Sequence, residues 1–241
     1  MTAVIDASNL HASYGRLPVL FDIDLSVERG KVLAILGANG AGKTTLLSVL
    51  AGLMPAESGA VRFCGEDVTD EPAERRIRRG LALVQGGAAV FPSLSVDENL
   101  RAACFSLPVS DTGLNERHDR VFLLFPVLRD RRSQLAGTLS GGERQMLALA
   151  KGLLLGGELL CIDELSLGLA PLVVEQLGDV VQRLRAEGRT MIIVEQSVSL
   201  ALRLADEVMV LERGRVVLQG PTAELAAELH RLEAALLGGA A

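Results

Sequence analysis

The stretch that decides the fold is Gly37-Ala38-Asn39-Gly40-Ala41-Gly42-Lys43-Thr44-Thr45, which has the spacing G-x-x-x-x-G-K-T. The apolar run at 31–36 before it suits a buried strand, and residues 46–51 after it have the composition of a helix. A strand, a glycine-rich turn and a helix in this order are the context that a phosphate-binding loop requires. The sequence therefore predicts that the chain binds a nucleoside triphosphate.

Each residue type in this loop has its own task. Gly37, Gly40 and Gly42 are expected to adopt backbone dihedral angles closed to other residues, so that main-chain N–H groups surround phosphate oxygens. The helix beginning near Gly42 adds unpaired N–H groups and the positive end of its dipole. We expect Lys43 to reach the terminal phosphates and the Thr44 hydroxyl to bind Mg²⁺. An ordinary glycine turn is the alternative, and the flanking elements argue against it.

Length and composition indicate one compact unit with subdomains. The chain has 241 residues, of which 49% are hydrophobic and 22% charged, with a net charge of −6. The negative charge argues against a dedicated nucleic-acid binder. Three widely spaced cysteines match no metal-ligand pattern and indicate reduced thiols in a cytosolic compartment. The N-terminus lacks signal-peptide features, and no apolar run approaches the ~18 residues of a membrane span, so we expect any membrane role to be peripheral.

The order of predicted elements indicates a parallel α/β core behind an N-terminal sheet. Residues 4–8 and 21–27 alternate apolar and polar side chains, which predicts strands with one solvent-facing side. Later apolar runs alternate with helical stretches, so the core sheet is expected to be parallel, with its ligand at the carboxyl ends of the strands. A basic cluster at 75–79 is expected to be the solvated face of a short helix. Tyr14, the only tyrosine, fits adenine stacking and packing in a turn equally well.

Residues 88–152 are predicted to form a helical subdomain inserted into this core. Ser95 and Glu98 fit a capping box that opens one helix. A second helix is expected over 115–128, with a packing face of Val121, Leu123, Leu124 and Phe125. The chain is thus predicted to divide into three parts: residues 1–87, the β subdomain and first part of the core; 88–152, the helical subdomain; and 153–241, the second part of the core with a closing hairpin and helix.

Two carboxylates, Asp163 and Glu164, end a predicted buried strand over 158–164. The carboxyl end of a parallel strand is where such a sheet binds its ligand. One acid there can hold Mg²⁺ opposite Thr44, and its neighbour can polarise an attacking water. Two surface acids at a strand end are the alternative, and the phosphate loop upstream favours the functional interpretation.

The motif Leu139-Ser140-Gly141-Gly142-Glu143 opens another predicted helix. Ser140-x-x-Glu143 is a capping box, so the motif has a purely structural interpretation. Two glycines in a first turn, however, cost about 0.5–1 kcal/mol each relative to alanine. Close approach of the backbone to a phosphate at this helix N-terminus would offset that cost.

These motifs, in this order along the chain, resemble the ATPase subunit of an ATP-binding cassette (ABC) transporter over essentially the whole sequence. Segments 166–171, 194–196 and 237–239 are similar to branched-chain amino acid importer ATPases of the LivF type. The resemblance implies an α/β fold: a RecA-like phosphate-loop NTPase core with an N-terminal antiparallel β subdomain and an inserted α-helical subdomain. It also implies a head-to-tail dimer with two ATP molecules at its interface.

The resemblance implies a role for each matching residue. The loop of one subunit and Ser140, Gly141, Gly142 and Glu143 of the other enclose each ATP, and Tyr14 stacks on the adenine. Glu164 is the general base, assisted by Gln196 and Gln85. The Mg²⁺ ligands are Thr44, Asp163 and Gln85.

The implied partners are a second ABC ATPase subunit, identical or homologous, transmembrane permease subunits and, through the permease, an extracytoplasmic solute-binding protein, with no nucleic acid. The protein would lie peripherally on the cytoplasmic face of the cell membrane. There it would energise import of branched-chain amino acids or similar small polar solutes. Two alternatives are a weakly active regulatory subunit of a heterodimeric complex and a soluble ABC ATPase without a transport role.

Three positions depart from the family's pattern. Leu165 stands where proline usually follows the catalytic glutamate, which we expect to affect loop rigidity more than chemistry. Gln196 replaces the usual histidine, as in the LivF-type subunits; its amide can bond a phosphate but cannot carry charge. The family's Q-loop position falls on Gly86, one residue after Gln85, in the run Gly86-Gly87-Ala88-Ala89. Either the loop shifts so that Gln85 meets Mg²⁺, which we expect, or the subunit lacks that ligand.

Overall fold

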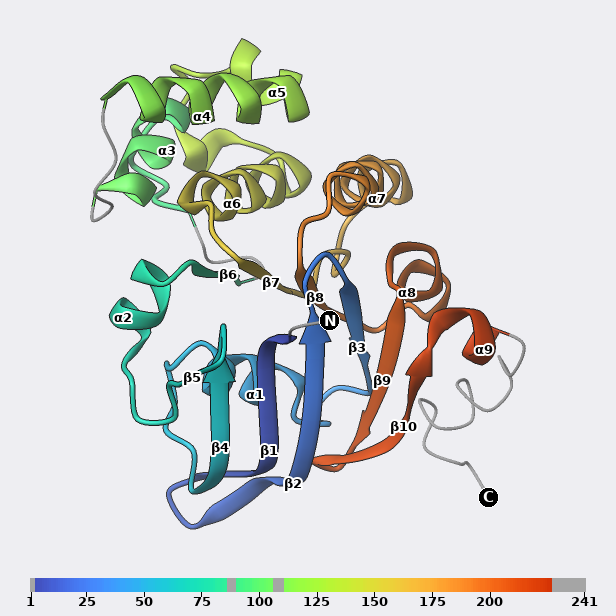
Figure 1. Cartoon of the computed structure of the whole chain (residues 1–241). Helices are drawn as coiled ribbons and strands as arrows, with labels where there is room; N and C mark the ends of the chain where they lie inside the picture. The colour runs from blue at the N-terminus through green and yellow to red at the C-terminus, as the bar shows by residue number, and fades with distance from the viewer. Residues whose placement is uncertain (1–2, 86–89, 106–110, 227–241) are drawn as a thin grey trace.

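Two β-sheets form the scaffold of the protein (Figure 1). The computed structural model describes residues 3–85, 90–105 and 111–226. The larger sheet has the order β10-β9-β3-β8-β7-β6, with β10 antiparallel to β9 and the other neighbours parallel. Its strands are β3 (Val32–Leu36), β6 (Leu81–Val84), β7 (Leu159–Asp163), β8 (Met191–Glu195), β9 (Glu207–Glu212) and β10 (Arg215–Pro221).

The second sheet is antiparallel, in the order β2-β1-β4-β5, as predicted for the N-terminal part. Its strands are β1 (Ala3–Tyr14), β2 (Leu17–Glu28), β4 (Ser58–Phe63) and β5 (Glu66–Asp67). The first two strands are longer than the alternating pattern predicts. Asn9, with a φ of 47°, lies at a register shift that interrupts the alternation, although pairing continues to Tyr14 and Leu17.

The parallel sheet separates two hydrophobic cores. In β3, Leu33 and Ile35 face the core shared with the antiparallel sheet and α1 (Lys43–Leu50). Val32, Ala34 and Leu36 face the opposite core, which includes α6 (Gly141–Leu155), α7 (Pro171–Ala186) and α8 (Val198–Leu204). Because both faces are covered, the strand is apolar throughout, and this run is what made it predictable.

Helices α3 to α6 gather at one end of the molecule, away from the antiparallel sheet (Figure 1). They are α3 (Val96–Cys104), α4 (Asp111–Leu124) and α5 (Pro126–Asp130), followed by the 3₁₀ turn η1 (Ala136–Thr138) and α6. The Ser95–Glu98 capping box is confirmed, since the Glu98 N–H donates to Ser95 Oγ at 3.2 Å and Ser95 N–H to Glu98 Oε2 at 2.7 Å. The three-part division of the chain stays a prediction.

The helix predicted over 115–128 is wrong in its last turn. α4 ends at Leu124 and Pro126 begins α5, because proline has no N–H to continue a helix but fits its first turn. The predicted packing face is also wrong at Leu123, which is 72% exposed, whereas Val121 and Phe125 are buried.

The basic cluster at 75–79 is not wholly solvated, contrary to the prediction. Arg76, in α2 (Ala73–Arg78), is only 1% exposed. Its guanidinium donates to main-chain carbonyls at the end of α1 and in the segment before α2, those of Val49, Leu50, Val68, Thr69 and Glu71. The planar five-donor fork satisfies carbonyls that a helix end leaves without partners.

The described residues end with α9 (Thr222–Ala226). Over the described ranges, none of the helices combines the length and apolar character needed to cross a membrane.

Candidate functional site

Three parallel strands deliver the predicted site residues to one edge of the sheet. Leu36 of β3 pairs with Glu195 of β8, and Asp163 of β7 pairs with Val194, so these strands end at the same level. The phosphate loop, Asp163-Glu164 and Gln196 follow from those ends. The carboxyl edge of the sheet is therefore the candidate site.

The loop glycines serve two different purposes. Gly40 (φ 81°) and Gly42 (φ 105°) have left-handed backbone conformations, as predicted, and Gly42 is the N-cap of α1. The same expectation was wrong for Gly37, whose φ lies outside that region. A Cβ at Gly37 would lie 2.4 Å from the Leu211 carbonyl oxygen, so glycine is needed there for close approach of β9.

Lys43 lies inside the loop and is 5% exposed. Its Nζ donates to the carbonyl oxygens of Gly37 at 2.8 Å and Ala38 at 3.0 Å. Burial lowers the pKa of Lys43, and the carboxylates of Glu164, Asp163 and Glu195 oppose this. The Lys43 ammonium therefore donates to two carbonyl oxygens, and phosphate oxygens can take their place as hydrogen-bond acceptors.

Asp163 supplies a buried oxygen that has no partner in the described part of the chain. It is 7% exposed, and burial raises its pKa against a hydrogen bond from the Thr44 side chain. Its Oδ1 has no hydrogen-bond partner among the described residues. Buried carboxylate oxygens are normally paired, and a carboxylate beside a hydroxyl is an oxygen donor set that a hard divalent cation prefers.

Gln85 follows β6 directly and is exposed. Val84 pairs with Ile162, so Gln85 comes level with Asp163 on the neighbouring strand. Gly86, the alternative Q-loop position, lies outside the described residues with the rest of 86–89.

Gln196 connects the phosphate loop to Glu164. Its Nε2 donates to Asn39 Oδ1 at 2.9 Å and to Glu164 Oε1 at 3.3 Å. Glu164 has a left-handed backbone (φ 53°), and its N–H donates to the Val194 carbonyl at 3.1 Å. Such a conformation costs about 1–3 kcal/mol in a non-glycine residue and persists where the surroundings impose it.

Leu165 shows how the surroundings hold this turn. Its side chain is fully buried in the core that contains α6 and α7. The chain after Glu164 is therefore anchored by apolar packing at the position where the family usually has proline.

Sequence reasoning missed Glu195, the last residue of β8. It is 1% exposed and accepts hydrogen bonds from Ser166 and Gln196. One signal for it was available: Glu195 closes an apolar strand just as Asp163 closes β7.

Ser140 and Glu143 form the predicted capping box at the start of α6. The Glu143 N–H donates to Ser140 Oγ at 3.2 Å, and the Ser140 N–H donates to Glu143 Oε2 at 2.8 Å. Within the part of the chain that the structure describes, no hydrogen bond joins 140–143 to the phosphate loop of the same chain. The two glycines differ: a Cβ at Gly142 would lie 2.6 Å from Val173 of α7, whereas at Gly141 the nearest atom is 3.9 Å away.

Replacing each glycine by alanine should separate packing from ligand approach. Gly142→Ala overpacks α6 against α7 and is expected to lower the free energy of unfolding by about 1–3 kcal/mol. At Gly141 a Cβ meets only the Leu169 side chain, at the ordinary contact distance of 3.9 Å, so Gly141→Ala should raise the free energy of unfolding by about 0.5–1 kcal/mol. A fall in ATPase activity in that variant would therefore report a ligand or a partner. Denaturant unfolding and phosphate release measure the two effects. Equal destabilisation by both substitutions would contradict this division.

Tyr14 is the last residue of β1 and is 57% exposed. Packing in a turn would require a buried ring, so the structure favours the stacking alternative. Stacking on adenine stays a prediction.

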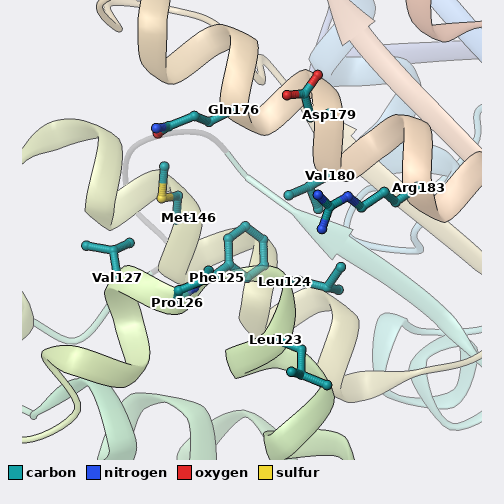
Figure 2. A pocket seen from close by; sticks show the side chains of 10 residues that line it. All are labelled: Leu123, Leu124, Phe125, Pro126, Val127, Met146, Gln176, Asp179, Val180 and Arg183. Atoms are coloured by element: carbon teal, nitrogen blue, oxygen red, sulfur yellow. The ribbon is translucent and has the colours of Figure 1, made fainter.

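A cavity of about 380 Å³ lies where the α4–α5 junction meets α6 and α7 (Figure 2). Figure 2 shows Gln176, Asp179 and Arg183 along α7 opposite the apolar side chains around Phe125. It has no lining residue in common with the phosphate loop or the β7 carboxylates. This cavity is therefore separate from the site at the edge of the sheet.

A parallel sheet that sets a G-x-x-x-x-G-K-T loop beside a strand ending in Asp-Glu defines the class of phosphate-loop nucleoside triphosphatases. Within that class the chain belongs to the ABC transporter family, whose model matches residues 20–166. It is an ATP-binding and ATP-hydrolysing cassette.

Similar proteins agree with this assignment. The chain is 42% identical over 226 residues to the high-affinity branched-chain amino acid transport ATP-binding protein BraG of Pseudomonas aeruginosa, covering 94% of this chain and 96% of that protein. It is 37% identical to the probable branched-chain amino acid transport ATP-binding protein LivF of Archaeoglobus fulgidus, covering 90% and 91%. A solved ATP-binding subunit of an ABC transporter matches the fold with a TM-score of 0.82 and 27% identity, covering 94% of this chain and 93% of that one. The predicted family and fold class are confirmed.

Proposed function

We propose that this protein hydrolyses ATP to energise the import of branched-chain amino acids or related small polar solutes. The observation that carries the proposal is the 42% identity to BraG over nearly the whole of both chains. The protein would bind peripherally to the cytoplasmic face of the membrane, against permease subunits, with a solute-binding protein on the other side.

The site geometry supports a division of labour for hydrolysis. The N–H groups of the loop and of the first turn of α1 bind the phosphates, and Lys43 exchanges its two carbonyl partners for phosphate oxygens. Glu164 takes the proton of the attacking water. The Gln196 amide, already bonded to Glu164 and Asn39, orients the carboxylate of Glu164 and reaches toward the γ-phosphate.

The residues also fit Mg²⁺. The unpartnered Asp163 Oδ1 and the neighbouring Thr44 hydroxyl would hold it, together with Gln85, which lies level with Asp163. Mg²⁺ held there would supply positive charge that offsets the negative charge of the phosphates.

The start of α6 supports assembly with a second cassette. In the described part of the chain, Ser140 and Gly141 do not bond the loop of their own chain, and a Cβ at Gly141 would meet only the Leu169 side chain, at 3.9 Å. In a head-to-tail dimer, residues 140–143 of one subunit would close over the nucleotide of the other.

Reconstitution tests the transport function. The full chain, with its permease and solute-binding protein in lipid vesicles, should show ATPase activity that leucine, isoleucine or valine stimulates, together with uptake of the amino acid. Acidic and basic amino acids serve as controls. Stimulation by a chemically unrelated solute alone would contradict the proposed substrate class.

A weakly active regulatory subunit is the second candidate, and the departures at Leu165 and residues 86–89 favour it. The burial of Leu165 weakens this candidate, because apolar packing anchors the turn after Glu164. Robust ATPase activity of the purified chain without another cassette would exclude it.

A further inference from the structure

We infer that Glu195 is a positioning residue for hydrolysis, holding the turns that carry Glu164 and Gln196 in one fixed arrangement. The inference rests on the assignment of Glu164 as the general base. Glu195 is 1% exposed, so it acts through other residues and does not touch the nucleotide.

The Glu195 carboxylate joins two segments that are adjacent only in space. Oε1 accepts the Ser166 N–H at 3.0 Å, and Oε2 accepts the Ser166 hydroxyl at 2.7 Å. Oε2 also accepts the Gln196 N–H at 3.2 Å, and the Ser197 N–H bonds the same carboxylate. One side chain therefore fixes the turn after β7 and the turn after β8.

Each turn carries a proposed catalytic group at or near a residue that bonds the Glu195 carboxylate. Ser166 is two residues after Glu164, and Gln196 is the next residue after Glu195. Gln196 Nε2 also joins the two turns directly, by donating to Glu164 Oε1 at 3.3 Å. A shift of Ser166 would change the distance between the Glu164 carboxylate and the Gln196 amide.

The hydrogen bonds of the Glu195 carboxylate indicate why an acid occupies this buried position. A buried acid is costly unless it is fully hydrogen-bonded, and Glu195 receives four donors. An apolar residue would suffice to fill the space, as Ile192 and Val194 do in the same strand. Among the residues that the structure describes, the donors to this carboxylate all come from the two turns, which indicates that joining them is the role of the acid.

The test compares Glu195→Gln and Ser166→Ala with the double substitution, in the full chain assembled as its active complex. Glu195→Gln keeps the shape but turns one acceptor into a donor facing main-chain N–H groups. We expect kcat to fall about tenfold, the loss expected for a hydrogen bond to a charged group, with the KM for ATP and the affinity for a fluorescent ATP analogue nearly unchanged. Ser166→Ala should lower kcat less. The double variant should match Glu195→Gln, because both act on the same link.

Asp206→Asn is the matched control. Asp206 is also a hydrogen-bonded carboxylate, accepting from Val32 N–H and Arg185, but it lies at the amino edge of the sheet. It should lower the denaturation midpoint without changing kcat of the folded protein. The inference would be overturned if Glu195→Gln had a normal kcat, or if it lost kcat and ATP affinity equally. It would also be overturned if the loss of kcat in the double variant equalled the product of the losses in the two single variants. An inactive wild-type complex would instead count against the proposed function.

Discussion

Glu164→Gln is expected to lower the kcat of ATP hydrolysis by about 10²–10⁴-fold, because an amide cannot take the proton of the attacking water. Glutamine has nearly the same shape and keeps an oxygen that can accept the hydrogen bond from Gln196 Nε2. ATP affinity should therefore stay nearly constant while the chemical step fails. Steady-state phosphate release and titration with a fluorescent ATP analogue separate the two quantities.

The same variant should accumulate as an ATP-bound dimer. If hydrolysis reopens the dimer, a chain that binds ATP without cleaving it stays closed, and size-exclusion chromatography with ATP detects the change in mass. Glu207→Gln, at the amino end of β9, is the matched control and should behave as wild type. Normal turnover by Glu164→Gln would refute the role of general base.

The parallel core was predictable because it is covered on both sides. β3, β7 and β8 are buried at every position, so they appear in the sequence as apolar runs, which Asp163 ends in β7 and Glu195 ends in β8. The carboxyl ends of these strands then brought the phosphate loop, Asp163 and Glu164 to one edge, as expected. Local signals also worked at helix starts, where Ser95 and Ser140 both form their capping boxes.

Two of the errors came from contacts between segments far apart in the sequence, whereas the wrong last turn of the helix predicted over 115–128 came from a local signal, Pro126. Nothing near Arg76 shows that the end of α1 needs donors for its carbonyls, so a buried arginine was mistaken for a solvated one. Gly37 was expected to need a special dihedral angle, whereas it is needed for the approach of Leu211 of β9. Glycine is needed at position 142 partly because the Val173 side chain, on α7, leaves no room for a Cβ there.

The site shows the same limit. A motif identifies residues that touch the ligand, because their types follow from phosphate and metal chemistry. Glu195 serves Ser166 and Gln196 instead, and its four donors are visible only once β7 and β8 lie side by side.

Lys43→Met is expected to weaken ATP binding by roughly 10²–10³-fold, since losing one partner of a desolvated charge pair costs about 2–5 kcal/mol. The folded apo protein should tolerate the change, because methionine fills the space and removes an ammonium whose pKa burial already lowers. Titration with a fluorescent ATP analogue should thus show a large loss of affinity beside a small change in the denaturation midpoint. Lys31→Met is the matched control and should bind ATP normally. Lys31 precedes the amino end of β3, whereas the phosphate loop follows its carboxyl end. Equal affinity in the two variants would mean that the ammonium stays on the Gly37 and Ala38 carbonyls and does not move to the phosphates.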